Sequence, residues 1–151
     1  MPRKKLQLPS TVLEKLRTAR VARLATVDAH GTPQIVPVCF VFDNGCFYSA
    51  IDRKPKRIAP EKLTRLRNIR VNPRIALVID EYQEDWRELW YILVRGTAKI
   101  LPTSARKERR QVVRLLRKKY PQYASGMLPS DAPVIRITPE RVISWGNFTT
   151  D

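Results

Sequence analysis

The sequence predicts an α+β fold that is mainly β, in which six or more antiparallel strands form a small barrel with two to four flanking helices. Two observations carry this prediction. Apolar segments of strand length recur at short spacing along most of the chain, and the Asp-Asn-Gly turn at residues 43–45 is typical of a hairpin. Helical patterns are confined to a few segments, which favours a barrel over a parallel sheet with alternating helices.

The first half of the chain is predicted to contain one helix and three strands. Thr11 and Glu14 have capping-box spacing, and Val12, Leu13, Leu16 and Ala19 fall on one helical face. The predicted strands are 21–27, 34–42 and 46–51. Pro37 lies inside the second of these strands, which indicates an edge strand, a bulge or an interrupted ladder.

A basic segment at residues 52–74 opens the second half, with nine Lys or Arg residues and two acidic residues around a short helix. Helix N-terminal amides and basic side chains both favour a bound phosphate, so this segment is a candidate anion site. Two strands are predicted to follow at 75–82 and 89–101, joined by an acidic loop. A basic amphipathic helix is expected at 104–120, and one or two closing strands at 134–145.

Composition sets the frame for the function. A chain of 151 residues that is 43% hydrophobic is long enough for one buried core, so we expect a single domain over residues 1–151. The formal charge of +15 makes polyanions candidate partners. No apolar run is long enough to span a membrane, and the N-terminus lacks the apolar stretch of a signal peptide. Cys39 and Cys46 are expected to be reduced thiols of a cytoplasmic protein.

The sequence contains no self-sufficient catalytic motif. Glycine-rich nucleotide motifs and the zinc-protease motif are absent. His30 lies in a turn with nothing in sequence to mark it as a base, and the carboxylates near residues 80–85 are typical of a solvated loop. We therefore expect no catalytic side chain and no metal site. If the protein is an enzyme, the sequence indicates that a cofactor performs the chemistry.

The order of these segments resembles the pyridoxamine 5′-phosphate oxidase-like, FMN-binding split β-barrel superfamily. Four pieces carry the resemblance: LATVDAHGTPQIVPV, the basic KPK…LRNIRVNPR element, DEYQEDW…LWY, and VRGTAKIL. They are most similar to the branch that uses the deazaflavin coenzyme F420. The resemblance implies a split barrel, a homodimer with two cofactor sites at the subunit interface, and a basic clamp for the cofactor phosphate.

The resemblance also assigns candidate cofactor-binding residues. A flavin or deazaflavin ring needs backbone N–H and C=O groups at its edge, which a proline-interrupted strand can offer. The candidates are Gln34, Val36 and Pro37 for the ring, Ser49, Ala50 and Ile51 for the ring or ribityl chain, Lys56, Lys62 and Arg65 for the phosphate, and Trp90 against the cofactor or substrate. The insert at residues 57–61 departs from shorter relatives and leaves the register of the clamp open.

Several readings stay open at this point. We expect an F420-dependent oxidoreductase that exchanges a hydride with a small organic substrate, because the poly-glutamate tail of F420 suits a broad basic surface. The alternative cofactor is FMN, in a pyridoxamine 5′-phosphate oxidase-related protein. A basic nucleic-acid-binding module is a competing class, although no helix-turn-helix, zinc-finger, RNP or KH pattern is present. A cofactor carrier or heme-degrading relative is a third reading. For Trp86, Tyr91 and Trp145, packing in the core or in a dimer interface competes with a role near the cofactor.

Overall fold

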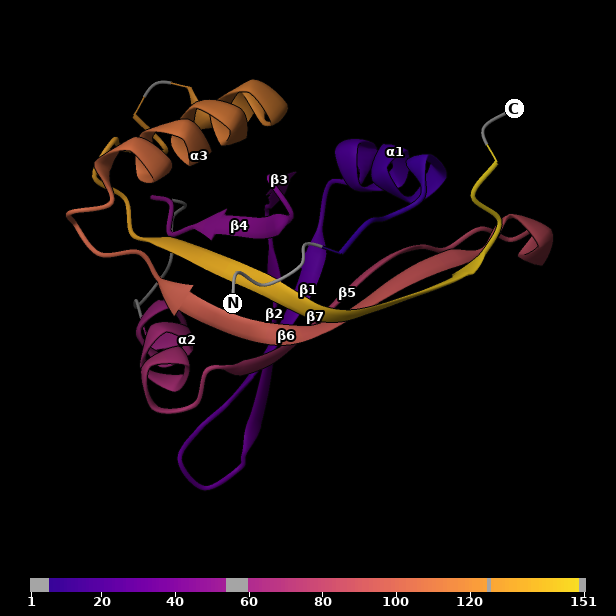
Figure 1. Ribbon diagram of the computed structural model, residues 1–151. Helices are drawn as coiled ribbons and strands as arrows, with labels where there is room; N and C mark the ends of the chain where they lie inside the picture. The colour runs from indigo at the N-terminus through magenta and orange to yellow at the C-terminus, as the bar shows by residue number, and fades with distance from the viewer. Residues whose placement is uncertain (1–5, 54–59, 125, 150–151) are drawn as a thin grey trace.

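The computed structural model describes residues 6–53, 60–124 and 126–149. Its centre is a strongly curled sheet of seven strands, in which every neighbouring pair is antiparallel (Figure 1). The strand order is β2-β1-β5-β6-β7-β4-β3. Together with its flanking helices this sheet is a split β-barrel, so the predicted fold class is confirmed.

The strands follow the apolar segments of the sequence closely. Their bounds are β1 Ala22–Val27, β2 Pro33–Val38, β3 Val41–Asp43, β4 Cys46–Ala50, β5 Arg74–Glu81, β6 Trp90–Ile100 and β7 Val134–Gly146. β2 lies at one edge of the sheet, which is one of the three alternatives that Pro37 left open. The long strands β6 and β7 pair with each other along almost their whole length and make up the middle of the sheet.

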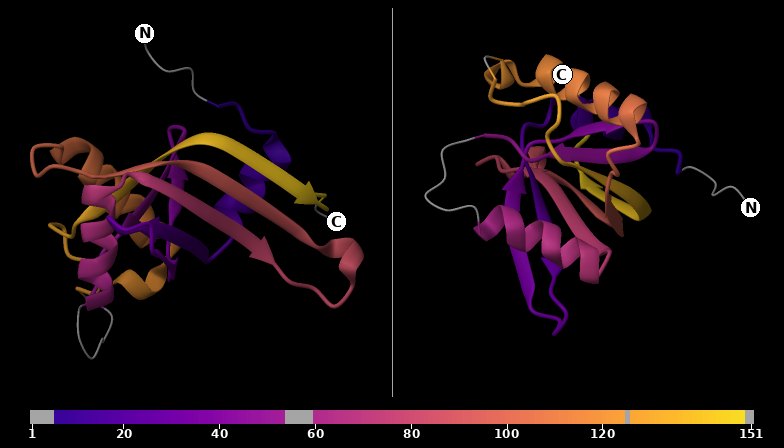
Figure 2. Two further views of the ribbon diagram at one scale, coloured as in Figure 1. Left: turned by 90° about the horizontal axis from the view of Figure 1, so that it is seen from below. Right: turned by 90° about the vertical axis from the view of Figure 1, so that its left-hand side faces the viewer.

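The helices lie at three places around the sheet (Figures 1 and 2). They are α1 Ser10–Thr18, α2 Pro60–Val71 and α3 Arg106–Lys119, with short 3-10 helices η1 Trp86–Glu88 and η2 Pro121–Tyr123. α2 packs against β1 and β6, whereas α1 and α3 both contact β3. α2 and α3 therefore flank the end of the barrel where β6 finishes (Figure 1).

Two local signals explain how the chain makes its sharpest changes of direction. The hairpin between β3 and β4 turns at Asn44 and Gly45, whose φ angles are 50° and 80°. A two-residue hairpin turn requires positive φ angles, which Asn and Gly adopt more easily than other residues. In the β6–β7 ladder a register shift follows Arg95. There Gly96 approaches Thr138 so closely that a Cβ atom would lie 2.1 Å from its carbonyl oxygen. These features let the sheet curl into a barrel.

β4 divides the interior into two hydrophobic clusters. Phe47 and Ile51 belong to the larger cluster inside the barrel, with residues from α1, α2 and most strands. Tyr48 and Ala50 belong to the second cluster, which α3 covers with Val112, Val113 and Leu116. Because both faces of β4 are covered, its side chains from Phe47 to Ala50 are all buried.

The structure corrects two local predictions and decides a third. α1 begins at Ser10 with Pro9 as its N-cap residue and no side-chain cap, so the capping box predicted at Thr11 is wrong. The strand predicted at 34–42 is two strands, because the backbone at Phe40 bonds to the hydroxyl of Tyr120 and leaves the ladder. The closing segment is one strand, and it tolerates Pro139 because the register shifts beside that residue.

Candidate functional site

A tight turn joins β1 to the edge strand β2 and forms one wall of the candidate site. Oδ1 of Asp28 accepts hydrogen bonds from the backbone N–H groups of His30 (2.8 Å) and Thr32 (2.9 Å). Gly31 has a φ of 81° and completes the turn. The two backbone bonds, that of Thr32 first, lower the pKa of Asp28. His30 serves this turn through its backbone.

Helix α2 is fixed to the sheet beside this turn. Nδ2 of Asn68 donates a hydrogen bond to Oγ1 of Thr26 at 3.1 Å, and both residues are buried. Leu66 and Ile69 point from the same helix into the larger core cluster. A buried polar contact between two apolar anchors fixes both the position and the rotation of the helix.

Between α2 and the β1–β2 hairpin lies a cavity of about 560 Å³. Gln34 lines it from β2, and the helix contributes four residues at the spacing of one helical face: Thr64, Arg67, Asn68 and Val71. Gln34 pairs with Thr26 across the β1–β2 ladder, so the strand, the helix and their shared hydrogen bond meet at this point.

Gln34 carries the most informative atom of this cavity. Its Oε1 atom is buried and has no hydrogen-bond partner among the described residues. Buried side-chain oxygens are nearly always bonded, because an unbonded one forfeits its hydration. Gln34 is therefore ready to accept a hydrogen bond from a molecule in the cavity. Arg67 supplies positive charge at the same cavity and makes no ion pair with a described carboxylate.

The other two residues predicted to contact the ring lie on the same edge strand. Val36 is half-buried, and its two neighbours in the strand, Ile35 and Pro37, are exposed. β2 pairs only with β1 among the described strands, so its outer edge offers backbone groups to a ligand or a partner. Of the three residues only Gln34 lines the cavity, and Pro37 points to the opposite face of β2 from Gln34 and Val36.

Ser49, Ala50 and Ile51 lie elsewhere. All three are buried, with exposed fractions of 2%, 7% and 2%, and they pack within the two core clusters or beside them. Ser49 and Ala50 pair with Ile135 and Val134 of β7. The structure does not bring their side chains to the cavity that Gln34 lines.

The predicted phosphate clamp is described only in part. Lys56 lies outside the described residues, and so does the side chain of Lys62, whose backbone belongs to α2. Arg65 is buried, on a different face of α2 from Arg67. Arg67 is the cation that the described part of this helix brings to the cavity.

Trp90 lies at the opposite end of β6 from α2. Its buried ring packs 5.8 Å from the ring of Phe148, and the ammonium of Lys15 lies 5.4 Å from its centroid. Gly96 lies near the level of the cavity, six positions further along β6 than Trp90. Six positions along a strand correspond to a length of roughly 20 Å. Within one chain, Trp90 does not meet Gln34.

Sequence reasoning missed the cavity-lining face of α2. Thr64, Arg67, Asn68 and Val71 lie at positions i, i+3, i+4 and i+7, a spacing visible in the sequence. The prediction for this segment rested on its many lysines and arginines and not on the helical periodicity of these four residues. A search for one helical face would have found these residues.

The outer face of the sheet is a second feature of the site region. Tyr91 of β6 and Trp145 of β7 are register partners whose rings stack at 5.5 Å with an interplanar angle of 22°, and both are exposed. Towards the cavity end follow Val78, Leu93 and Ile143, which are register neighbours and only half-buried. An apolar sheet face with stacked aromatic rings is typical of a surface that another molecule covers.

No described helix is long and apolar enough to cross a membrane. Within the same residues, no group of three or more His, Cys, Asp or Glu side chains is placed to hold a metal ion.

Comparisons with known proteins agree with one another. The family model for pyridoxamine 5′-phosphate oxidase matches residues 8–146. A 5a,11a-dehydrotetracycline/5a,11a-dehydrooxytetracycline reductase of Streptomyces rimosus is 33% identical over 135 residues, which cover 87% of this chain and 78% of the relative.

Solved structures show the same fold. An FAD-binding protein of Mesorhizobium loti is 26% identical, with a TM-score of 0.64 and coverage of 91% of this chain and 94% of that one. An F420 reductase is 22% identical, with a TM-score of 0.64 and coverage of 90% and 98%.

Proposed function

This chain belongs to the pyridoxamine 5′-phosphate oxidase family, and on that premise we propose that it is a cofactor-dependent oxidoreductase. We propose that it holds coenzyme F420, or alternatively FMN, and transfers a hydride between the cofactor and a small organic substrate. The reductase activity in the name of the Streptomyces relative supports the reaction class. The absence of a catalytic motif from the sequence is consistent with a reaction that the cofactor performs.

The observation that carries this proposal is the buried, unbonded Oε1 atom of Gln34. Flavins and deazaflavins present N–H and hydroxyl donors along one edge of the ring and along the ribityl chain. Either kind of donor would satisfy this oxygen. Val36 and Pro37 continue the same edge, and the apolar side chain of Val71 at the cavity suits a flat ring.

The residues of the chain would bind and orient the cofactor. Gln34 would accept a hydrogen bond, and Arg67 would attract the phosphate, together with Lys56 and Lys62 of the predicted clamp; Arg65, buried on another face of α2, would not take part. Asn68 would keep α2 at the right distance through its bond to Thr26. When bound, the reduced cofactor supplies the hydride.

Net charge favours F420 over FMN in this proposal. The formal charge is +15, and F420 carries a poly-glutamate tail beyond its phosphate, so a basic surface attracts it more strongly. We expect micromolar or tighter binding of F420 and weaker binding of FMN. The advantage of F420 should shrink as salt is raised, because salt screens exposed charges.

A homodimer is part of the proposal. The half-buried apolar residues Val78, Leu93 and Ile143, with the stacked Tyr91 and Trp145, form a face suited to a second copy of the chain. A two-fold dimer would also explain how the aromatic end of the sheet, distant from the cavity within one chain, reaches a cofactor held by the partner.

One assay tests the activity. Purified protein is given reduced F420 or reduced FMN with 5a,11a-dehydrotetracycline, the conjugated acceptor in the name of the relative, and cofactor oxidation is followed by absorbance. We expect turnover with F420. Binding of a cofactor without turnover would narrow the proposal to another acceptor. Binding of neither cofactor, with tight binding of duplex DNA instead, would favour the nucleic-acid reading.

A further inference from the structure

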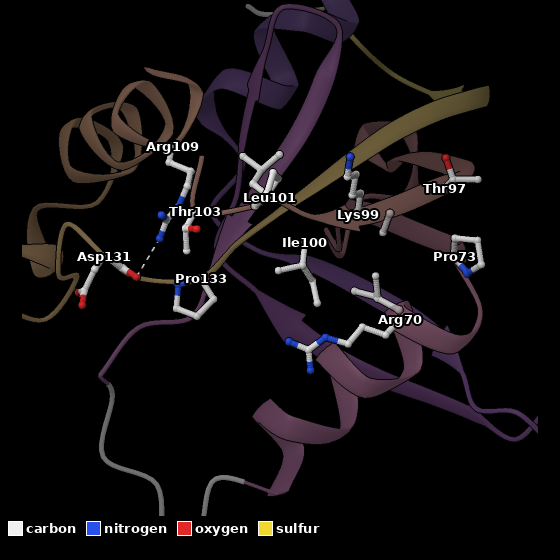
Figure 3. Close-up of a pocket in the computed structure, with 13 residues that line it drawn as sticks. Arg70, Pro73, Thr97, Lys99, Ile100, Leu101, Thr103, Arg109, Asp131 and Pro133 are labelled. Carbon is white, nitrogen blue, oxygen red and sulfur yellow. Dashed lines mark hydrogen bonds between the residues drawn. The ribbon is translucent and has the colours of Figure 1, made fainter. Parts of the chain in front are cut away.

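A second and larger cavity, of about 880 Å³, lies on the other side of α2 (Figure 3). Its floor is apolar and comes from Ile69 of α2, from Ile100 and Leu101 at the end of β6, and from Pro133. Three cations stand around this floor: Arg70, Lys99 and Arg109. They belong to α2, β6 and α3, so the fold brings together charges from three separate elements.

These three cations have no carboxylate in direct contact within the described structure, although Lys99 lies close enough to Glu108 for their charges to interact. None of them makes an ion pair with a described carboxylate. The closest acid on α3, Glu108, already accepts hydrogen bonds from Tyr48 at 2.6 Å and from Arg136 at 3.0 and 3.1 Å. Asp131 also lines the cavity, but in Figure 3 its carboxylate points away from Arg70 and Lys99. The cavity therefore keeps a net positive charge beside an apolar floor.

Arg109 is held in place by neutral groups. Its Nη2 donates to the backbone oxygens of Asp131 at 3.0 Å and Ala132 at 3.3 Å. Its Nε is buried and has no partner among the described residues. Backbone carbonyls orient a guanidinium without cancelling its charge, so this side chain has a fixed direction and a free donor.

A second hollow of about 550 Å³ continues from Arg109 along α3. It is lined by Arg106, Arg110, Arg114 and Arg117, again with Arg109. Arg117 is oriented like Arg109, because its Nη2 donates to the backbone oxygen of Leu128 at 2.6 Å. We call the two hollows together the arginine track.

We propose that the arginine track binds a small organic polyanion, a molecule with an apolar ring or chain and two or more phosphate or carboxylate groups. The apolar body would lie on the floor formed by Ile69, Ile100 and Pro133. Its first anionic group would meet Arg70, Lys99 and Arg109, and further groups would follow the hollow along α3. This site is separate from the Gln34 cavity, because α2 presents different residues to the two sides.

The apolar floor of the first hollow favours a small ligand over nucleic acid. A duplex backbone presents phosphates and sugars and needs only cations, whereas here three cations surround an apolar floor. Lys107 and Lys118 serve as the comparison. They are cations on the same helix, exposed like Arg106 and Arg110, but they line neither hollow.

Calorimetric titration at 150 mM salt tests the proposal with three probes: adenosine triphosphate, inorganic tripolyphosphate and a hexaglutamate peptide. We expect adenosine triphosphate to bind more tightly than tripolyphosphate, because only the former has a body for the apolar floor. Comparison of tripolyphosphate with hexaglutamate distinguishes phosphate from carboxylate recognition.

Two matched double variants test whether the cations of the arginine track bind the probe. Arg70→Gln/Lys99→Gln removes two charges that make no described hydrogen bond, and it should weaken adenosine triphosphate binding at least about tenfold. Lys107→Gln/Lys118→Gln removes the same charge from α3 outside the track, and its affinity should stay within about twofold of the wild type. The single variant Arg109→Lys keeps the charge but loses the planar guanidinium with its fixed donors, and should also weaken adenosine triphosphate binding.

Three results would overturn the proposal. The first is equal weakening by the two double variants, which would indicate a non-specific effect of net charge. The second is the absence of binding of all three probes by the wild-type protein. The third is tight binding of duplex DNA that depends on Lys107 and Lys118, which would assign the basic helix to a nucleic acid.

Discussion

Asn68 of α2 donates a hydrogen bond through Nδ2 to Oγ1 of Thr26 on β1 at 3.1 Å, and the two residues are only 3% and 2% exposed. This single polar contact connects the helix that lines one side of the candidate site with the strand that supports Gln34 on the other. The width of the cavity therefore depends on a bond between two buried side chains.

The first prediction concerns this bond. Thr26→Val keeps the shape of the side chain but leaves the buried Asn68 amide without its acceptor, so the free energy of unfolding should fall by about 1–3 kcal/mol. Urea denaturation measures the change. Thr97→Val is the control, because Thr97 lies in strand β6 and its hydroxyl makes no described hydrogen bond. An equal loss in both variants would show that the Asn68 contact contributes nothing specific.

A second prediction concerns Tyr120, which fixes the break between β2 and β3. Its hydroxyl accepts from the N–H of Phe40 at 3.0 Å and lies 2.9 Å from the carbonyl oxygen of Arg20 and 3.1 Å from that of Phe40. Tyr120→Phe should lower the free energy of unfolding by about 1–3 kcal/mol, since it leaves a buried N–H unbonded. Tyr91→Phe, whose exposed hydroxyl makes no described bond, should leave stability unchanged. A stable Tyr120→Phe protein would refute this role.

The third prediction is a pH dependence at Lys119. Burial lowers the pKa of Lys119 to about 8 from 10.5, and the positive charge of Arg20 acts in the same direction. Between these two pKa values the unfolded chain binds more protons at this residue, so its contribution to stability grows as pH rises from about 8 towards 10.5. The residue is partly exposed, and after discounting for solvent screening the gain is on the order of 1 kcal/mol.

Lys119→Met provides the measurement for this pH effect. The difference in unfolding free energy between the wild type and Lys119→Met should shift in favour of the wild type from pH 7.5 to 9.5. The window stops there because burial also raises the pKa of Tyr120 to about 12, which lowers stability above pH 10. A difference that stays constant over this range would contradict the lowered pKa.

Much of the fold is visible in the sequence because local signals agree with tertiary packing. The Asp-Asn-Gly turn predicted the β3–β4 hairpin, and Pro37 predicted an edge strand, a bulge or an interrupted ladder, of which the structure shows the edge. Both signals act within a few residues of where they lie. The division of the 34–42 segment depends instead on Tyr120, eighty residues away, so no local pattern could have shown it.

The candidate site was predictable only in part, for a similar reason. Gln34 was assigned from the resemblance and from the proline of its strand, and it lies at the cavity, whereas its contact with a cofactor stays a prediction. Ser49 and Ala50 are buried because β7 and α3 cover β4, and such coverage depends on distant segments. The cation at the cavity is Arg67 rather than Arg65, a choice that depends on how α2 is rotated by the contact between Asn68 and Thr26.

The fourth prediction concerns the dimer. At low micromolar concentration and high salt, sedimentation equilibrium should give the mass of two chains, because salt spares an apolar interface. Leu93→Glu places a charge in the middle of the outer sheet face and should give a monomer. Leu13→Glu, at an exposed position on α1, should remain a dimer. A wild-type monomer under these conditions would remove the dimer from the proposal.

The measurement that tests the central claim most directly is a fluorescence titration of wild type and Gln34→Leu with F420 and with FMN. Gln34→Leu removes the unbonded Oε1 atom and keeps the bulk of the side chain, so the unfolding free energy should not fall. Cofactor affinity should fall about tenfold, while the exposed control Gln122→Leu binds like the wild type. Unchanged affinity in folded Gln34→Leu would contradict the placement of the cofactor between β2 and α2, and binding of neither cofactor by the wild type would contradict the proposed function.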